Sequence, residues 1–169
     1  TAIIDGIGIG FANAVSAGRV GFIATSGTSA QEATVLLDRF GVGVSTCLVT
    51  GRRDLTDKVG AATALDSLAR LATDTATEVI LLVADAWSPE VARRLLPALA
   101  ATGKPGSVCL MGADGVASPD GVEVHPAIDG AALGAARLAG ARPVIPATEP
   151  TGWVSAGHVR GIFSGPGLC

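Results

Sequence analysis

Four short apolar segments alternate along the chain with segments of helical periodicity, and this alternation constrains the fold more than any other feature. The apolar segments cover 19–24, 44–50, 78–84 and 107–111, and the helical segments cover 30–40, 61–72, 89–101 and 127–139. Strands that are apolar on both faces are typical of parallel sheets covered by helices on both sides. Because crossover connections are right-handed, we expect an α/β fold, a three-layer α/β/α doubly wound parallel sheet.

The expected strand order is the flavodoxin-like 2-1-3-4-5, with a short fifth strand at 144–145. The first helix is expected to bury Val35, Leu36 and Phe40 on one face. A run of alternating glycines at 6–10 lacks the third glycine of a dinucleotide-binding motif at the right spacing. That run is therefore interpreted as a flexible lead-in and not as a cofactor site.

The two ends of the chain differ from its middle. Residues 1–18 and 141–169 are rich in Gly, Pro, Thr and Ser and lack amphipathic periodicity. We therefore expect a lead-in segment over 1–18, a flavodoxin-like domain over 19–145 and a Pro/Gly-rich C-terminal arm over 146–169.

Composition excludes several classes of function. Twelve basic and fifteen acidic residues give a net charge of −3 with no Lys/Arg-rich run, so no nucleic-acid partner is expected. The apolar segments are far shorter than the roughly 20 residues of a membrane span, so no membrane partner is expected. The three cysteines, Cys47, Cys109 and Cys169, form no C-x-x-C motif, which argues against a disulfide framework or a metal site. A reducing, cytoplasmic location is expected.

The candidate site lies where the parallel strands end, because ligands of open parallel sheets bind beyond the carboxyl ends of the strands. Ser26, Gly27, Thr28 and Ser29 join a strand directly to a helix. Free N–H groups, hydroxyls and the positive helix end suit a phosphate or a carboxylate. Alternatively, Ser29 or Thr28 caps the helix and Glu32 completes a capping box. The sequence leaves both interpretations open.

Three further groups fall at the same edge. Arg52 and Arg53 are candidate anion contacts, although adjacent loop arginines are also typical of a solvated surface. Asp85 follows the third strand and is a candidate proton acceptor or histidine-orienting carboxylate, with capping of the next turn as the alternative. His125, in the fourth loop (112–126), is the candidate catalytic histidine.

Taken together, the motifs resemble the FdrA branch of the acyl-CoA synthetase superfamily. The segment RVGFIATSGTSAQE (19–32) is similar to the strand–Ser-Gly-Thr–helix element in the second domain of the succinyl-CoA synthetase α subunit. Further similarity to the FdrA branch lies in TAIIDG (1–6), GFAN (10–13), TGRRDL (50–55), VRGIFSG (159–165) and the final Leu-Cys. The similarity covers nearly the whole chain and keeps its order.

The resemblance implies roles for particular residues. Ser26, Gly27 and Thr28 would form the cradle for the phosphate of a phosphohistidine, and Asp85 would be the carboxylate beside that histidine. His125 lies near the family's spacing for the phosphohistidine, but the family's Gly-His-Ala-Gly-Ala motif is replaced by Val124-His-Pro-Ala. FdrA-type proteins generally lack that motif and have been linked to carbamoyl transfer.

The resemblance also implies a function for the whole protein. We expect a fragment or minimal domain of an FdrA-like acyl-CoA synthetase, without the Rossmann-like CoA-binding domain and inactive in ligation by itself. CoA and ATP or ADP are implied for the full-length protein and no cofactor for this chain. Expected partners are a small anionic substrate or phosphate, other domains or subunits of the complex, and a second copy in a homodimer. The alternatives are a carbamoyltransferase component of oxamate or allantoin breakdown and a non-catalytic scaffold domain.

Overall fold

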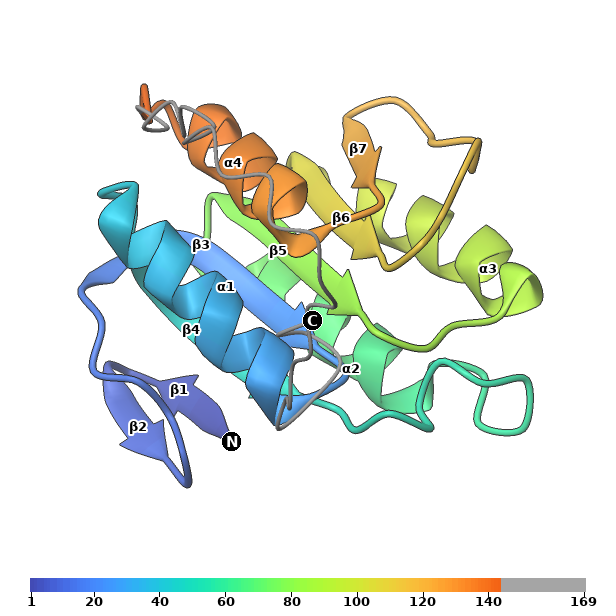
Figure 1. The fold of residues 1–169 in the computed structure, drawn as a ribbon, viewed down its shortest axis with the longest axis horizontal. Helices are drawn as coiled ribbons and strands as arrows, with labels where there is room; N and C mark the ends of the chain where they lie inside the picture. The colour runs from blue at the N-terminus through green and yellow to red at the C-terminus, as the bar shows by residue number, and fades with distance from the viewer. Residues whose placement is uncertain (144–169) are drawn as a thin grey trace, which may run out of the picture.

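The structure, a computed structural model, describes residues 1–143, which form a seven-stranded sheet with helices on both faces (Figure 1). The strands are β1 (Ala2–Ile4), β2 (Ile7–Ile9), β3 (Ala17–Ala24), β4 (Val44–Val49), β5 (Val79–Ala84), β6 (Gly106–Leu110) and β7 (Val122–His125). The helices are α1 (Gly27–Arg39), α2 (Ala62–Thr73), α3 (Pro89–Ala100) and α4 (Ile128–Leu138). Across the sheet the strands follow the order β2-β1-β4-β3-β5-β6-β7.

The strands from β3 to β7 are parallel, in the order β4-β3-β5-β6-β7. The first four of these strands along the chain, β3 to β6, follow the predicted order 2-1-3-4, and the predicted three-layer α/β/α fold class is confirmed. Helices α1 and α4 cover one face of the sheet, and α2 and α3 cover the other (Figure 1). Along β5 the odd-numbered side chains pack toward α1 and α4, and the even-numbered ones pack toward α2 and α3. All six are buried, which explains why this strand is apolar throughout.

The inner face of α1 differs from the predicted one. Ala33 and Leu37 are fully buried, whereas Val35, Leu36 and Phe40 are only partly buried. The helix begins at Gly27, three residues earlier than the periodicity predicts, and its buried side chains follow a spacing of three to four residues from there. Val35, Leu36 and Phe40 therefore lie beside the row of buried side chains on α1 and not within it.

The fifth parallel strand also differs from prediction. β7 (Val122–His125) holds the edge position that the sequence assigned to 144–145, which lie outside the described residues. The expected loop over 112–126 therefore contains a strand. Only four residues long, β7 alternates buried Val122 with exposed Glu123, a pattern too short to be recognised. The predicted C-terminal arm, 146–169, also lies outside the described residues.

Residues 1–18 contain a β-hairpin where the sequence suggested a flexible lead-in. β1 and β2 pair antiparallel, and β1 pairs antiparallel with β4, so the hairpin extends the sheet at that edge. Asp5 (φ 51°) and Gly6 (φ 74°) form the two-residue turn. Positive φ at both central residues is the turn geometry that matches the twist of the paired strands.

Side chains beyond the hairpin attach this segment to α1. The Ser16 N–H donates to Asp38 Oδ1 at 2.8 Å, and the Asn13 side-chain amide donates to the Gln31 carbonyl at 2.7 Å. Hydrogen bonds from Ser16 lower the pKa of the Asp38 carboxyl, because they favour its charged form.

Two of the three cysteines lie in the core. Cys47 and Cys109 are buried and form no disulfide within residues 1–143. Burial raises the pKa of both thiols to about 12, and the nearby Asp85 carboxylate contributes to the increase at Cys109. Cys169 lies outside the described residues.

Candidate anion-binding site

The turn between β3 and α1 places four polar residues at the carboxyl edge of the sheet. Ser26 is the N-cap of α1, with extended backbone, and its Oγ accepts the Ser29 N–H at 3.2 Å. The Ser26 hydroxyl donates to Ser29 Oγ at 2.9 Å, and Thr28 Oγ1 lies 3.3 Å from Ser26 Oγ. The capping interpretation is thus realised by Ser26 and not by Thr28 or Ser29. Because Ser26 is the N-cap, the third residue of the helix, which is Glu or Gln in a capping box, is Ser29 and not Glu32.

These contacts show which hydrogen-bond donors of the turn already have a partner and which do not. The Ser26 hydroxyl donates to Ser29 and the Ser29 hydroxyl donates to Asp85, so neither is free to donate to a ligand. The N–H groups of Gly27 and Thr28 donate to no described residue. A Cβ added at Gly27 would have only an ordinary contact of 3.5 Å, with the Thr1 side chain. The two free amides therefore lie at the positive end of a helix of 13 residues.

Asp85, directly after β5, joins this turn from the neighbouring strand. Its Oδ1 accepts the Ser29 hydroxyl, and its backbone N–H donates to Thr25 Oγ1 at 3.0 Å. Asp85 Oδ2 is buried and has no partner among the described residues. The predicted alternative, capping of the next turn, belongs to Ser88 alone, whose Oγ accepts the Val91 N–H as the N-cap of α3. Asp85 therefore completes a hydrogen-bonded chain from Ser26 through Ser29.

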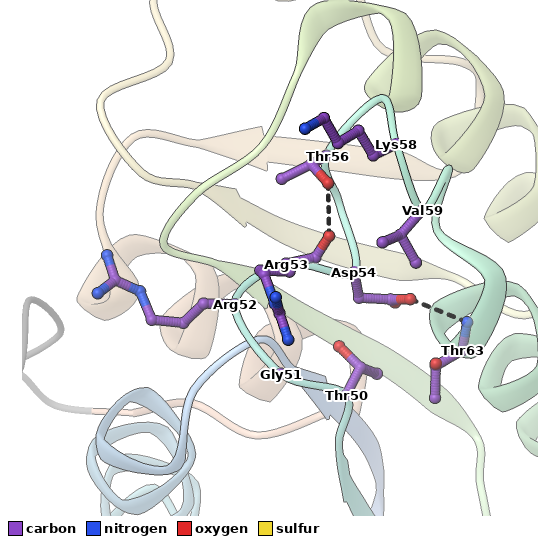
Figure 2. A pocket seen from close by; sticks show the side chains of 9 residues that line it. All are labelled: Thr50, Gly51, Arg52, Arg53, Asp54, Thr56, Lys58, Val59 and Thr63. Carbon is purple, nitrogen blue, oxygen red and sulfur yellow. Dashed lines mark hydrogen bonds between the residues drawn. The ribbon is translucent and has the colours of Figure 1, made fainter.

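Arg52 and Arg53 do not line the Ser26–Ser29 turn. They lie in the loop between β4 and α2, on a separate pocket of about 500 Å³ that Lys58 and Thr50 also line. Figure 2 shows Arg53 folded back over Gly51 and Thr50, whereas Arg52 extends away from the other side chains.

His125, at the end of β7, lies apart from both the Ser26–Ser29 turn and the pocket lined by Arg52 and Arg53. β6 separates β7 from β5, and His125 Nε2 is buried without a hydrogen-bond partner among the described residues. Its nearest charged neighbour is Glu123, at 3.4 Å from Nε2. A Cβ added at Gly130 or Gly134 of α4 would lie 3.2 Å from Nδ1 or 2.8 Å from Nε2, so the imidazole packs against these glycines. The structure gives His125 no hydrogen bond to Asp85 or to the α1 turn.

Several polar residues at this edge were not identified from the sequence. Thr25 accepts a hydrogen bond from the Asp85 backbone N–H. Thr50, Lys58 and Thr63 line the pocket that Arg52 and Arg53 also line, called the basic pocket below. The signal for Lys58 was available, since it lies only five residues after Arg53 in the same loop. The threonines carry no such signal, because strand ends, loops and the first turns of helices commonly contain them.

Two further observations concern the described part of the chain. Within residues 1–143, no cluster of three or more His, Cys, Asp and Glu side chains has a geometry that could hold a metal ion. Over the same residues, no helix combines the length and apolarity needed to cross a bilayer.

Comparison with known proteins gives two similarities. No protein-family model matches the chain. It is 34% identical over 181 aligned positions to the "Uncharacterized protein YahF" of Escherichia coli (strain K12), a match that takes in all of this chain and 35% of YahF. The chain thus spans about a third of the length of that relative.

A solved structure shares the fold. The "Ca. Korarchaeum cryptofilum dinucleotide forming Acetyl-coenzyme A synthetase 1 in complex with phosphate and ADP" superposes with a TM-score of 0.56 at 18% identity. The match covers 74% of this chain and 31% of that one. The chain therefore shares its fold with about a third of that synthetase.

Proposed function

We propose that the chain is an anion-binding domain of an acyl-CoA synthetase-like protein of the FdrA branch. It would hold a phosphate or carboxylate group at the N-terminus of α1. The observation that carries the proposal is the pair of N–H groups at Gly27 and Thr28, which have no partner among the described residues in a turn whose serine hydroxyls are already paired. The acetyl-CoA synthetase of similar fold, described with phosphate and ADP, supports it.

In this proposal the residues of the turn have different roles. The amides of Gly27 and Thr28 donate to the anion, and the helix end adds roughly half a positive charge. Ser26, Ser29 and Asp85 act as positioning residues, because their mutual hydrogen bonds hold the turn. His125 has no part in binding the anion. CoA and the nucleotide would bind elsewhere in a longer, cytoplasmic protein or complex.

Asp85 also sets the strength of the site. Its carboxylate accepts from Ser29 in the first turn of α1, so a bound anion meets a like charge. Two unit charges a few ångströms apart repel by about 1 kcal/mol even in water. We therefore expect weak binding, with a Kd on the order of 1 mM, which corresponds to about −4 kcal/mol.

The test is an amide NMR titration of the 169-residue chain with inorganic phosphate at constant ionic strength. The amides of Gly27 and Thr28 are expected to shift together with one Kd. Asp85→Asn removes the like charge while its Oδ1 can still accept from Ser29, so it is expected to tighten phosphate binding about fivefold. Gly27→Val is expected to abolish the shifts, because a β-branched side chain beside the two amides blocks the approach of an anion, and its Cβ meets only Thr1 Oγ1, at an ordinary contact of 3.5 Å.

The control is Thr73→Val, at the exposed end of α2. It should leave the phosphate shifts at the α1 turn unchanged. Saturating phosphate without shifts at Gly27 and Thr28 would reject the site and favour the alternative of a non-catalytic scaffold domain, in which the turn is a helix cap alone.

A further inference from the structure

We infer that the pocket between β4 and α2 is a second anion site, which takes the phosphate group of a small phosphate monoester. The pocket measures about 500 Å³ and is lined by residues of the loop that begins at Thr50 and by Thr63 of α2 (Figure 2). None of its lining residues belongs to the Ser26–Ser29 turn. The inference is therefore independent of the proposed function.

The charge of the pocket matches a dianion. Arg52, Arg53 and Lys58 line it, and none of the three forms an ion pair with a residue of the described 1–143. The single lining carboxylate, Asp54, is buried, and its two oxygens accept the N–H groups of Thr63 and Ala64 at 3.0 and 2.8 Å. Three cations and one carboxylate leave two positive charges. A phosphate monoester carries about −1.5 to −2 at pH 7, whereas a monocarboxylate carries only −1.

Neutral hydrogen-bond donors supplement the positive side chains of the pocket. The backbone N–H groups of Gly51, Arg52 and Arg53 donate to no described residue. Gly51 has a φ of 97°, and a Cβ added there would meet no atom within 4 Å, so the backbone is open to a ligand at this point. Successive free amides next to a positive-φ residue form a concave site for anions. The Thr50 hydroxyl, shielded from water, also has no partner among residues 1–143.

The size of the pocket favours an ester over free phosphate. A volume of about 500 Å³ lies within the range of small-molecule sites and leaves space beyond a single phosphate group. Val59, which is 43% exposed, gives that space an apolar wall. We therefore assign the phosphate to the Arg53 side of the pocket and the organic part to the Val59 side. Arg53 is the main contact, because its side chain points toward Gly51 whereas that of Arg52 extends outward (Figure 2).

The experiment is an amide NMR titration of the full chain at constant ionic strength, in separate arms with glycerol 3-phosphate, inorganic phosphate and acetate. Shifts at Gly51, Arg52 and Arg53 report this pocket, whereas shifts at Gly27 and Thr28 report the α1 turn, so the two proposals can fail separately. The monoester is expected to bind the pocket more tightly than inorganic phosphate, and acetate is expected to give no saturable shift there. Equal affinity for phosphate and monoester would overturn the ester assignment, and equal affinity for acetate would overturn the phosphate assignment.

Substitutions of Arg53 test whether this side chain contacts the phosphate group. Arg53→Gln is expected to weaken the monoester about tenfold, since it removes a charge-assisted contact, and Arg53→Lys is expected to restore only part of the affinity because it lacks the guanidinium fork. Arg70→Gln is the matched control, since it removes the same charge from an exposed position on α2 and is expected to leave the affinity within about twofold. An equal loss in Arg53→Gln and Arg70→Gln would overturn the inference and leave only a general effect of net charge.

Discussion

Asp54→Asn is expected to destabilise the fold through the start of α2. That helix has no side-chain cap of its own, since its N-cap is Ala61 with a φ of 63°. The Asp54 carboxylate, seven residues upstream, takes this role by accepting the Thr63 and Ala64 N–H groups from a buried position. It thereby joins the β4 loop to the helix. The same contact positions the loop that lines the basic pocket (Figure 2).

The magnitude follows from the two hydrogen bonds. An asparagine can still accept one N–H through its Oδ1, but its amide group turns a donor toward the other. The variant loses one charge-assisted bond, worth about 1.5–3 kcal/mol, and the carboxylate's interaction with the helix end, worth about 1 kcal/mol. We therefore expect the free energy of unfolding to fall by about 3 kcal/mol. With an m-value of about 2 kcal/mol/M, the midpoint of urea unfolding falls by about 1.5 M.

The assay is urea unfolding of the full chain followed by circular dichroism, with Asp66→Asn as the matched control. Asp66 lies on the same helix and pairs with Arg70, but both side chains are mostly exposed, so its loss is expected to cost less than about 0.5 kcal/mol. An Asp54→Asn midpoint within error of the control would refute the reasoning, because Asp54 would then contribute no more than a surface carboxylate.

Two further predictions concern stability and reactivity. Lys104 donates from Nζ to the carbonyls of Leu71 and Asp74, both at 2.6 Å, at the end of α2, so Lys104→Met is expected to lower the free energy of unfolding by about 2 kcal/mol in the same urea assay. Cys47 and Cys109, with pKa values raised to about 12, are expected to resist iodoacetamide at pH 8 in the native chain and to react in urea, as read by peptide mass spectrometry. Because the unfolded thiols ionise first, stability is unaffected by them below about pH 9 and falls as the pH rises toward 12. Rapid native labelling at position 47 or 109 would contradict this.

Some features missed from the sequence had a local signal. Asp5-Gly6 between isoleucine-rich segments is a strong hairpin signal, and the structure uses both residues at positive φ. The interpretation of this segment as a flexible lead-in depended instead on the run of alternating glycines at 6–10. β7 had no comparable signal, since its four residues become a strand only through pairing with β6.

The sequence by itself determined the layers, the order of the first four parallel strands and the position of the α1 turn. Burial on both faces makes β5 apolar throughout, and a buried strand that runs directly into a helix requires a polar turn such as Ser26–Ser29. These properties are local or periodic and are therefore visible along the chain. Only the tertiary structure decided which polar groups meet. It directs Asp85 to Ser29, 56 residues away in sequence, and places Arg53 on a pocket of its own. Such contacts depend on side-chain direction and on packing between neighbouring strands, which residue spacing does not encode.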